Sequence, residues 1–151
     1  MRRNDGRPMQ PKEFEEHVIQ IKRVSKKSKG GSSISFTALV VIGDKKGRVG
    51  AGYGKALDVA TAVQKAVLKA KKEMIRVNLK ESTISHEVSA SYGSATVFLK
   101  PAPKGSGIIA GGSVRTVVGM AGIKDISSKM LGSNNKISNV RCTIKALSKV
   151  R

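Results

Sequence analysis

The 151-residue chain is poor in several residue types, and each shortage excludes a kind of protein. Its single cysteine, Cys142, leaves no partner for an internal disulfide and cannot supply a cysteine-based zinc site. Tryptophan is absent, and the other aromatic residues are two tyrosines and three phenylalanines. The core must therefore be built from Val, Ile, Leu and Ala, and Cys142 is expected to be a packing residue in it.

Long apolar runs are also missing. No stretch approaches the roughly 20 apolar residues of a membrane-spanning helix. The N-terminal sequence MRRNDGRPMQPKEFEE is basic but lacks the apolar segment of a secretory signal. These features favour a soluble cytoplasmic protein without a membrane partner.

Acidic residues are scarce relative to basic ones. Ten Asp and Glu stand against 29 Lys and Arg, which gives a formal net charge of +19. The basic residues are spread along the whole chain rather than gathered in one tail. Such a charge favours a polyanionic partner, and its distribution indicates a protein that touches nucleic acid on several faces.

The first half of the chain predicts a β-β-β-α unit behind a flexible tail. Residues 1–12 carry charge, Gly and Pro without periodicity and are expected to form a flexible basic tail. A helical turn is expected at residues 14–16, before strands at residues 17–27, 34–43 and 48–56. Asp58 is the expected N-cap of a helix over residues 59–75. Together they form a domain over residues 13–76.

The second half predicts another α/β unit. Residues 77–82 are taken as a linker, and residues 83–151 as the second domain. Strands are expected at residues 83–90, 95–102 and 124–131, with helices over residues 114–121 and 137–150. Ser113 is the expected cap of the first of these helices, which Gly122 ends.

The stretch GRVGAGYGKA, residues 47–56, raises the possibility of a phosphate loop. It lacks the Ser or Thr that follows Gly-Lys in a P-loop, and its G-x-G-x-G spacing is not the dinucleotide fingerprint. Gly50, Gly52 and Gly54 alternate, so in a strand they share one face. Such a bare face accepts either a tightly packed helix or an RNA backbone, and both interpretations stay open.

Two basic clusters are candidate RNA contacts. The first spans residues 22–31 around a loop expected at residues 28–33, where glycines allow backbone N–H groups to approach phosphates. Its five cations are Lys22, Arg23, Lys26, Lys27 and Lys29. The residues expected to contact RNA are Arg23, Lys26, Lys27, Lys29, Gly30 and Gly31. The second surrounds a four-residue turn at residues 44–47, which has Asp first and Gly last; its members are Lys45, Lys46, Arg48 and Lys55. The alternative interpretation of the first cluster is a hairpin end whose charged side chains are simply solvated and bind no RNA.

The chain has too few histidines, cysteines and carboxylates to form a recognisable catalytic arrangement. His17 and His86 are the only histidines, and Asp125 is a lone acid suited to a turn or an ion pair. We therefore expect no enzyme activity, no cofactor and no metal site. A β-β-β-α unit with basic loops is instead the layout of domains that bind double-stranded RNA through its shape and phosphates.

Long segments in both halves resemble one known family. VSKKSKGG, SFTALVVIGDKKGRVGAGYGKA, FLKPAPKGSGIIAGGSVRTVVGMAGIKD and LGSNNKISNVRCTIKAL are similar to bacterial small-subunit ribosomal protein S5. The resemblance implies an α+β fold: an N-terminal domain like those that bind double-stranded RNA, followed by a two-layer α/β domain with a left-handed βαβ crossover. It also implies the ribosome as location, binding to small-subunit rRNA, subunit assembly and a contribution to translational accuracy at the body–head junction near the mRNA entry.

The resemblance further implies the partners of particular residues. The rRNA-binding loop corresponds to residues 26–33, and neighbouring proteins would be ribosomal proteins S4 and S8, with mRNA close by. The accuracy-linked protein contact would lie at Gly107 and Arg115. Two other functions stay open on the residues alone: a free regulator that binds double-stranded RNA, and a nucleotide-dependent RNA-modifying enzyme.

Overall fold

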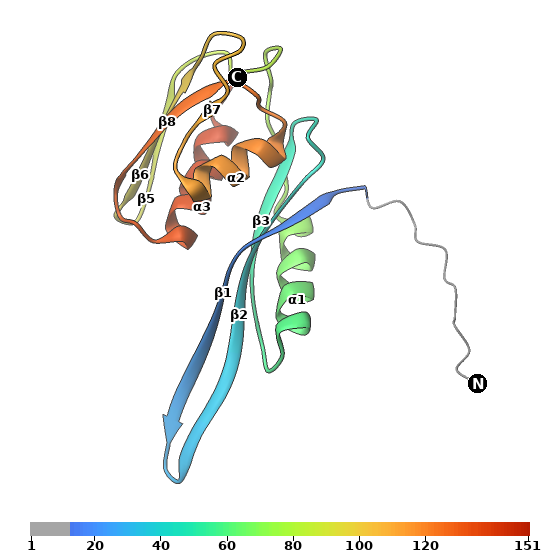
Figure 1. The fold of residues 1–151 in the computed structure, drawn as a ribbon, viewed down its shortest axis with the longest axis vertical. Coiled ribbons are helices and arrows are strands. Elements are labelled where there is room, and N and C mark those ends of the chain that lie inside the picture. The colour runs from blue at the N-terminus through green and yellow to red at the C-terminus, as the bar shows by residue number, and fades with distance from the viewer. Residues whose placement is uncertain (1–12) are drawn as a thin grey trace, which may run out of the picture.

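Two four-stranded sheets form the framework of the computed structural model, which describes residues 13–151 (Figure 1). The tail expected at residues 1–12 lies outside the described residues. The first sheet has the order β1-β2-β3-β4 and carries one helix. Its elements are β1 (Glu15–Ser28), β2 (Gly31–Gly43), β3 (Arg48–Ala56), α1 (Val59–Lys72) and β4 (Ile75–Arg76).

The second sheet has the order β5-β6-β8-β7 and carries two helices. Its parallel pair, β7 and β8, is joined through α2, which gives the βαβ unit that the resemblance implied. Its elements are β5 (Val88–Tyr92), β6 (Ala95–Pro101), β7 (Ile108–Ile109), α2 (Gly112–Ala121), β8 (Ile126–Gly132) and α3 (Lys136–Ser148). The predicted α+β fold class, with an antiparallel sheet and helix followed by an α/β domain, is thus confirmed.

The alternation of β2 explains how the layers stack. Ala38, Val40 and Ile42 lie in one apolar cluster with the buried residues of α1. Leu39 and Val41, which point the opposite way, join a second cluster with residues of α2, α3 and the second sheet. The first sheet therefore lies between α1 and the pair α2–α3, and that pair lies between the two sheets. The two halves therefore share the second of these clusters as a common core.

Two predictions for the first half are wrong. The helical turn at residues 14–16 is absent, because Glu15 and Glu16 already pair with Gly43 and Ile42 in the β1–β2 ladder. The loop expected at residues 28–33 shrinks to a two-residue turn, since Ser28 pairs directly with Gly31. In both places strand pairing overrides local propensity.

The predicted helix ends are mostly right. Asp58 caps α1 by accepting a hydrogen bond from the Thr61 backbone N–H at 3.2 Å. Gly122 ends α2 in the left-handed conformation, with φ of 93°. Ser113 is not the cap of α2: the cap is Gly111, and the Ser113 hydroxyl lies 3.6 Å from the sulfur of Met130. Helix α1 stops at Lys72, three residues before the predicted end.

The strand expected at residues 83–90 begins later than predicted. Thr83 pairs with Lys80 in an isolated bridge, and only from Val88 does the chain enter β5. Ile84 is buried in the shared core, so the apolar pattern that suggested a strand reflects packing of a loop. None of the helices in residues 13–151 is long and apolar enough to cross a membrane.

Candidate nucleic-acid interface

The alternating glycines of β3 face α1. A Cβ atom on Gly50, Gly52 or Gly54 would collide with the carbonyl oxygens of Ala70, Ala66 and Ala62, in that order. These alanines follow one another at intervals of four, so one bare stripe on the helix packs on one bare stripe of the strand. The packing interpretation is therefore correct for the glycines, and no RNA backbone can occupy this face.

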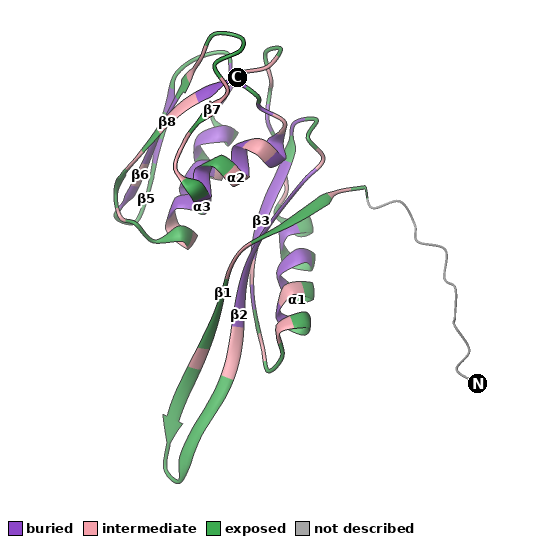
Figure 2. Ribbon diagram, in the orientation of Figure 1, coloured by how far each residue is buried: buried purple, intermediate pink, exposed green. Residues whose placement is uncertain are grey.

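The β1–β2 hairpin extends beyond the rest of the molecule (Figure 1). Toward the tip of the hairpin, Phe36 is the last residue of β2 that pairs with β3. Beyond it, β1 and β2 pair only with each other. Residues 23–36 are here called the basic arm. The five residue steps from Phe36 to Gly31 correspond to about 17 Å. Every residue from 25 to 34 is exposed, as Figure 2 shows. An isolated pair of strands is only marginally stable in water, so this arm suits a partner that covers it.

The basic arm carries charge of one sign on both faces. Residues 17–43 contain no Asp or Glu. The register places Lys26 opposite Ser33 and Lys27 opposite Ser32, so these two lysines point to opposite faces. Arg23 lies opposite Phe36, on the same face as Lys27. The arm therefore offers cations in two directions, with small hydroxyl side chains beside them.

The tip of the arm is built for close approach. Gly30 has φ of 85° and Gly31 has φ of 155°, and a Cβ on either would meet no other atom of the described residues within 4 Å. Glycine is favoured here because the turn requires positive φ angles, and the lack of side chains leaves the surface open. On β3, by contrast, glycine is required because α1 packs against the strand. Lys29 is the other turn residue. Backbone N–H groups and a lysine at a bare tip are suited to phosphate oxygens.

Lys55 was predicted in the second cluster, but the strand register places it beside the first. Lys55 pairs with Thr37, and Thr37 pairs with Lys22 on its other side. The three side chains form a row on one face of the sheet at the base of the basic arm. Lys55 is therefore at the opposite end of β3 from Arg48, and the grouping of four cations around one turn was wrong. Lys22 belongs to the first predicted cluster but was not among its predicted contacts, and the strand register places it in the same row as Lys55.

The turn at residues 44–47, which carries Lys45 and Lys46, lies beside α2. The Lys45 backbone N–H donates to the Met120 carbonyl at 3.1 Å, and the Gly47 N–H donates to the Ala121 carbonyl at 2.9 Å. Lys45 also forms an ion pair with Glu15 at 2.8 Å. The turn thus joins the two halves, and the β2 strand of about 40 Å separates it from the arm's tip.

Arg48 is held by two carboxylates and an aromatic ring. Its guanidinium lies 2.8 Å from Asp44, 3.2 Å from Glu13 and 4.8 Å from the ring centre of Phe14. Burial alone would raise the pKa of Asp44, but hydrogen bonds from the Arg48 side chain and from the Lys46 and Arg48 backbone N–H groups lower it below its usual value. Arg48 therefore stabilises the turn.

Gly107 and Arg115, predicted as a protein contact, lie close together. The Gly107 N–H donates to the Asp125 carboxylate at 2.9 Å, and the Arg115 guanidinium donates to the Ile108 carbonyl at 3.1 Å. A hollow of about 440 Å³ places Arg115 beside Lys45 and Lys124. These residues form a surface of their own, beside the turn of Lys45 rather than beside the basic arm.

Comparison with known protein families covers both halves of the chain. The N-terminal domain of ribosomal protein S5 matches residues 14–78, and the C-terminal domain of ribosomal protein S5 matches residues 90–151. The chain belongs to the ribosomal protein S5 family. This is a family of structural ribosomal proteins, and the resemblance seen in the sequence is confirmed.

Two similar members of the S5 family come from Campylobacter jejuni and Gloeobacter violaceus. The small ribosomal subunit protein uS5 of Campylobacter jejuni strain 81-176 is 52% identical over 139 residues, which cover 92% of this chain and 95% of that protein. The protein of the same name from Gloeobacter violaceus is 54% identical over 140 residues, which cover 92% of this chain and 63% of that protein.

Reactive groups of this S5-family member serve the fold. The buried Cys142 thiol donates to the Ala90 carbonyl at 3.0 Å, and its burial raises the pKa of the thiol. Asp125 accepts from the N–H groups of Gly105 and Gly107 and closes the loop before β7. Within the described part of the chain, no group of three His, Cys, Asp or Glu side chains is placed to hold a metal ion.

Proposed function

We propose that this chain is a structural component of the small ribosomal subunit and that its basic arm binds rRNA. The observation that carries the proposal is an exposed, acid-free pair of strands with cations on both faces. Its RNA contacts are Arg23, Lys26, Lys27, Lys29, Gly30 and Gly31, with Lys55 and Lys22 at its base. Such a surface is attracted to RNA phosphates whatever the base sequence. A narrow two-stranded arm can enter an RNA groove or the space between two RNA helices.

The second surface belongs to the proposal in a different role. Lys45 and Arg48 are already paired with carboxylates, so the exposed Lys46 is the freer cation of that turn for RNA. Gly107 and Arg115 form the surface for a neighbouring ribosomal protein, with S4 as the expected neighbour there and S8 elsewhere. Location at the body–head junction, near the mRNA entry, and a contribution to accuracy follow from the family resemblance and are part of the proposal.

Incorporation into small subunits tests the proposal. In cells that depend on the variant, Lys26→Glu, Lys27→Glu and Lys29→Glu together are expected to reduce the amount of the protein in purified small subunits severely. The matched control reverses three exposed lysines of α1, at Lys65, Lys71 and Lys72, with the same change in net charge. Thermal unfolding of both purified variants shows whether the fold is retained.

The outcomes are distinct. Loss of incorporation for the arm variant alone supports the proposal. Equal incorporation of the two variants would contradict it. A wild-type protein that sediments mainly away from small subunits would favour the free regulator of double-stranded RNA instead.

A further inference from the structure

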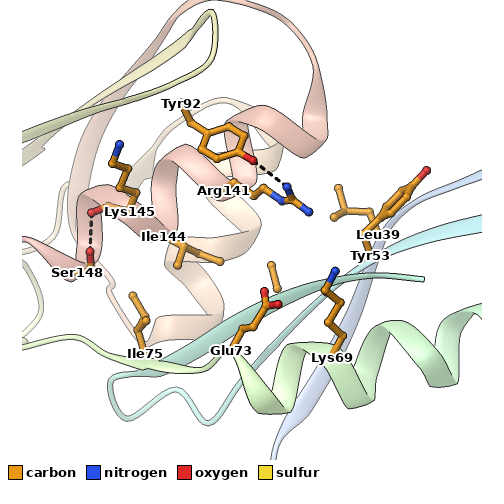
Figure 3. Close-up of a pocket in the computed structure, with 12 residues that line it drawn as sticks. Leu39, Tyr53, Lys69, Glu73, Ile75, Tyr92, Arg141, Ile144, Lys145 and Ser148 are labelled. Carbon is orange, nitrogen blue, oxygen red and sulfur yellow. Dashed lines mark hydrogen bonds between the residues drawn. The ribbon is translucent and has the colours of Figure 1, made fainter. Parts of the chain in front are cut away.

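A cleft lies where the first sheet meets α3, away from the basic arm. Its volume is about 500 Å³, within the range of roughly 300–1,000 Å³ that is usual for small-ligand sites. Figure 3 shows side chains entering it from α1 on one side and from α3 on the other. The cleft is thus formed only because the two halves share a core.

The floor of the cleft is apolar and lies along an open strand edge. Leu39 and Ala51 of the first sheet meet Ile75 and Ile144 there. Strand β4 pairs with β3 only at Arg48 and Val49, so the β3 edge beside the cleft has no neighbouring strand among the described residues. A flat apolar floor bordered by free backbone groups suits a planar ligand with polar edges.

Three cations and one carboxylate surround this floor. Lys69 lies in α1 and Glu73 is the capping residue that follows this helix, while Arg141 and Lys145 come from α3. Of the ion pairs within residues 13–151, none includes any of these four side chains. Arg141 donates one bond to the Tyr92 hydroxyl at 2.8 Å, and its guanidinium retains donors that match two phosphate oxygens.

Both tyrosines of the chain line this one cleft. Tyr53 comes from β3 and Tyr92 from the end of β5, 39 residues later in the sequence. The Arg141 guanidinium lies 5.7 Å from the ring centre of Tyr92, so the ring and the cation are held together. The chain has few aromatic residues, so the presence of both tyrosines in one cleft, beside cations, indicates a site where a nucleic-acid base can stack.

We propose that this cleft binds a single unpaired ribonucleotide, with its base on the apolar floor beside the tyrosines and its phosphate at Lys69 and Arg141. Lys145 is left out of the phosphate contact, because its ammonium already donates to the Ser91 carbonyl at 3.0 Å and points away from the other two cations (Figure 3). The proposal rests on the proposed RNA-binding function but adds a site for single-stranded RNA. An acidic peptide fits less well, because Glu73 would repel its carboxylates whereas it can accept hydrogen bonds from the edge of a base.

Crosslinking and titration of the full-length protein test this site. Ultraviolet crosslinking to a six-nucleotide single-stranded RNA without self-complementarity, followed by mass spectrometry, is expected to mark peptides that contain Tyr53 or Tyr92. In titrations with the labelled oligonucleotide, Tyr92→Leu and Lys69→Gln are each expected to weaken binding at least about fivefold.

Two matched controls exclude general effects. Lys65→Gln removes an exposed lysine of α1 that does not line the cleft, and Phe98→Leu removes a half-exposed ring on the second sheet. Both are expected to bind the oligonucleotide within about twofold of wild type. The cleft variants and the controls should bind double-stranded RNA alike, since the basic arm is untouched.

Failure of this inference is separable from failure of the proposed function. Crosslinks confined to residues 22–36, or cleft variants that bind like the controls, would overturn the ribonucleotide site while leaving the arm's role standing. Displacement of the oligonucleotide by mononucleotides supports the site, and displacement by a polyglutamate peptide but not by mononucleotides would overturn it. Loss of duplex binding in the arm variants reports on the proposed function alone.

Discussion

Glycine serves two opposite purposes in two regions of this molecule. On β3, Gly50, Gly52 and Gly54 are bare because the backbone of α1 occupies the space where side chains would lie. At the tip of the basic arm, Gly30 and Gly31 are bare although no other part of residues 13–151 lies within 4 Å of where their side chains would be. The comparison teaches that glycines in a strand allow another group to approach the backbone closely. Only the surrounding structure tells whether that group belongs to the protein itself or to a partner.

The largest effect is expected where a side chain is added on the packed stripe. Gly52→Val places a branched side chain against the carbonyl of Ala66, and α1 must move away from the sheet. The free energy of unfolding in urea should fall by at least about 3 kcal/mol. Gly30→Ala is the control, and strain at its positive φ should lower stability by only about 1 kcal/mol. Equal losses would remove the distinction between the two regions.

The second effect concerns the basic arm. Neutralising Lys26, Lys27 and Lys29 to glutamine should reduce the affinity for duplex RNA roughly a hundredfold near 0.1 M salt and reduce the slope of log affinity against log salt by about 2 to 3. Stability should change by less than about 0.5 kcal/mol, because these side chains are exposed. Unchanged affinity with an unchanged salt slope would show that the arm does not meet phosphates.

A third effect is expected in acid. The Ser82 hydroxyl and the Gly107 N–H lower the pKa of Asp125, so the charged form is favoured in the folded state. A carboxyl of this kind stabilises the fold above its unfolded pKa, and the stabilisation is lost as the pH falls through the folded value. Asp125→Asn should therefore lower the Tm at pH 6, and the gap from wild type should narrow below about pH 4. A gap that stays constant down to pH 2 would exclude this role.

The smallest effect is expected at the turn beside α2. Lys45→Gln removes an ion pair with Glu15 in which both side chains are more than half exposed. Such pairs contribute roughly 0–1 kcal/mol, so the free energy of unfolding should fall by less than about 1 kcal/mol. A larger loss in denaturant titration would mean that the turn contributes more to the joint between the halves than its backbone bonds to α2 suggest.

Local signals in the sequence predicted much of this fold. The alternation over residues 34–43, the cap at Asp58 and the ends marked by Gly122 and by the turn at residues 44–47 each depend on a few neighbouring residues. The missed features depend on pairing between distant residues. Residues 28–33, at the end of the arm, looked like a loop because Ser, Gly and Lys favour turns, whereas the pairing of Ser28 with Gly31 extends both strands to the tip.

The candidate sites were predictable to the same degree. The cations of the basic arm are contiguous in sequence, so their cluster was visible, although their division between two faces required the strand register. The cleft was not visible at all. Tyr53, Lys69, Tyr92 and Arg141 come from four elements, and only the burial of both halves in a common core brings them together.

The hydrogen bonds from Lys45 and Gly47 to the end of α2, together with the common core, have a mechanical consequence. They oppose hinge motion between the halves, so the distance and angle between the base of the arm and the Arg115 surface are set by the shared core. Two ligands held at these ends would be kept at a constant separation, and the protein between them would act as a rigid spacer.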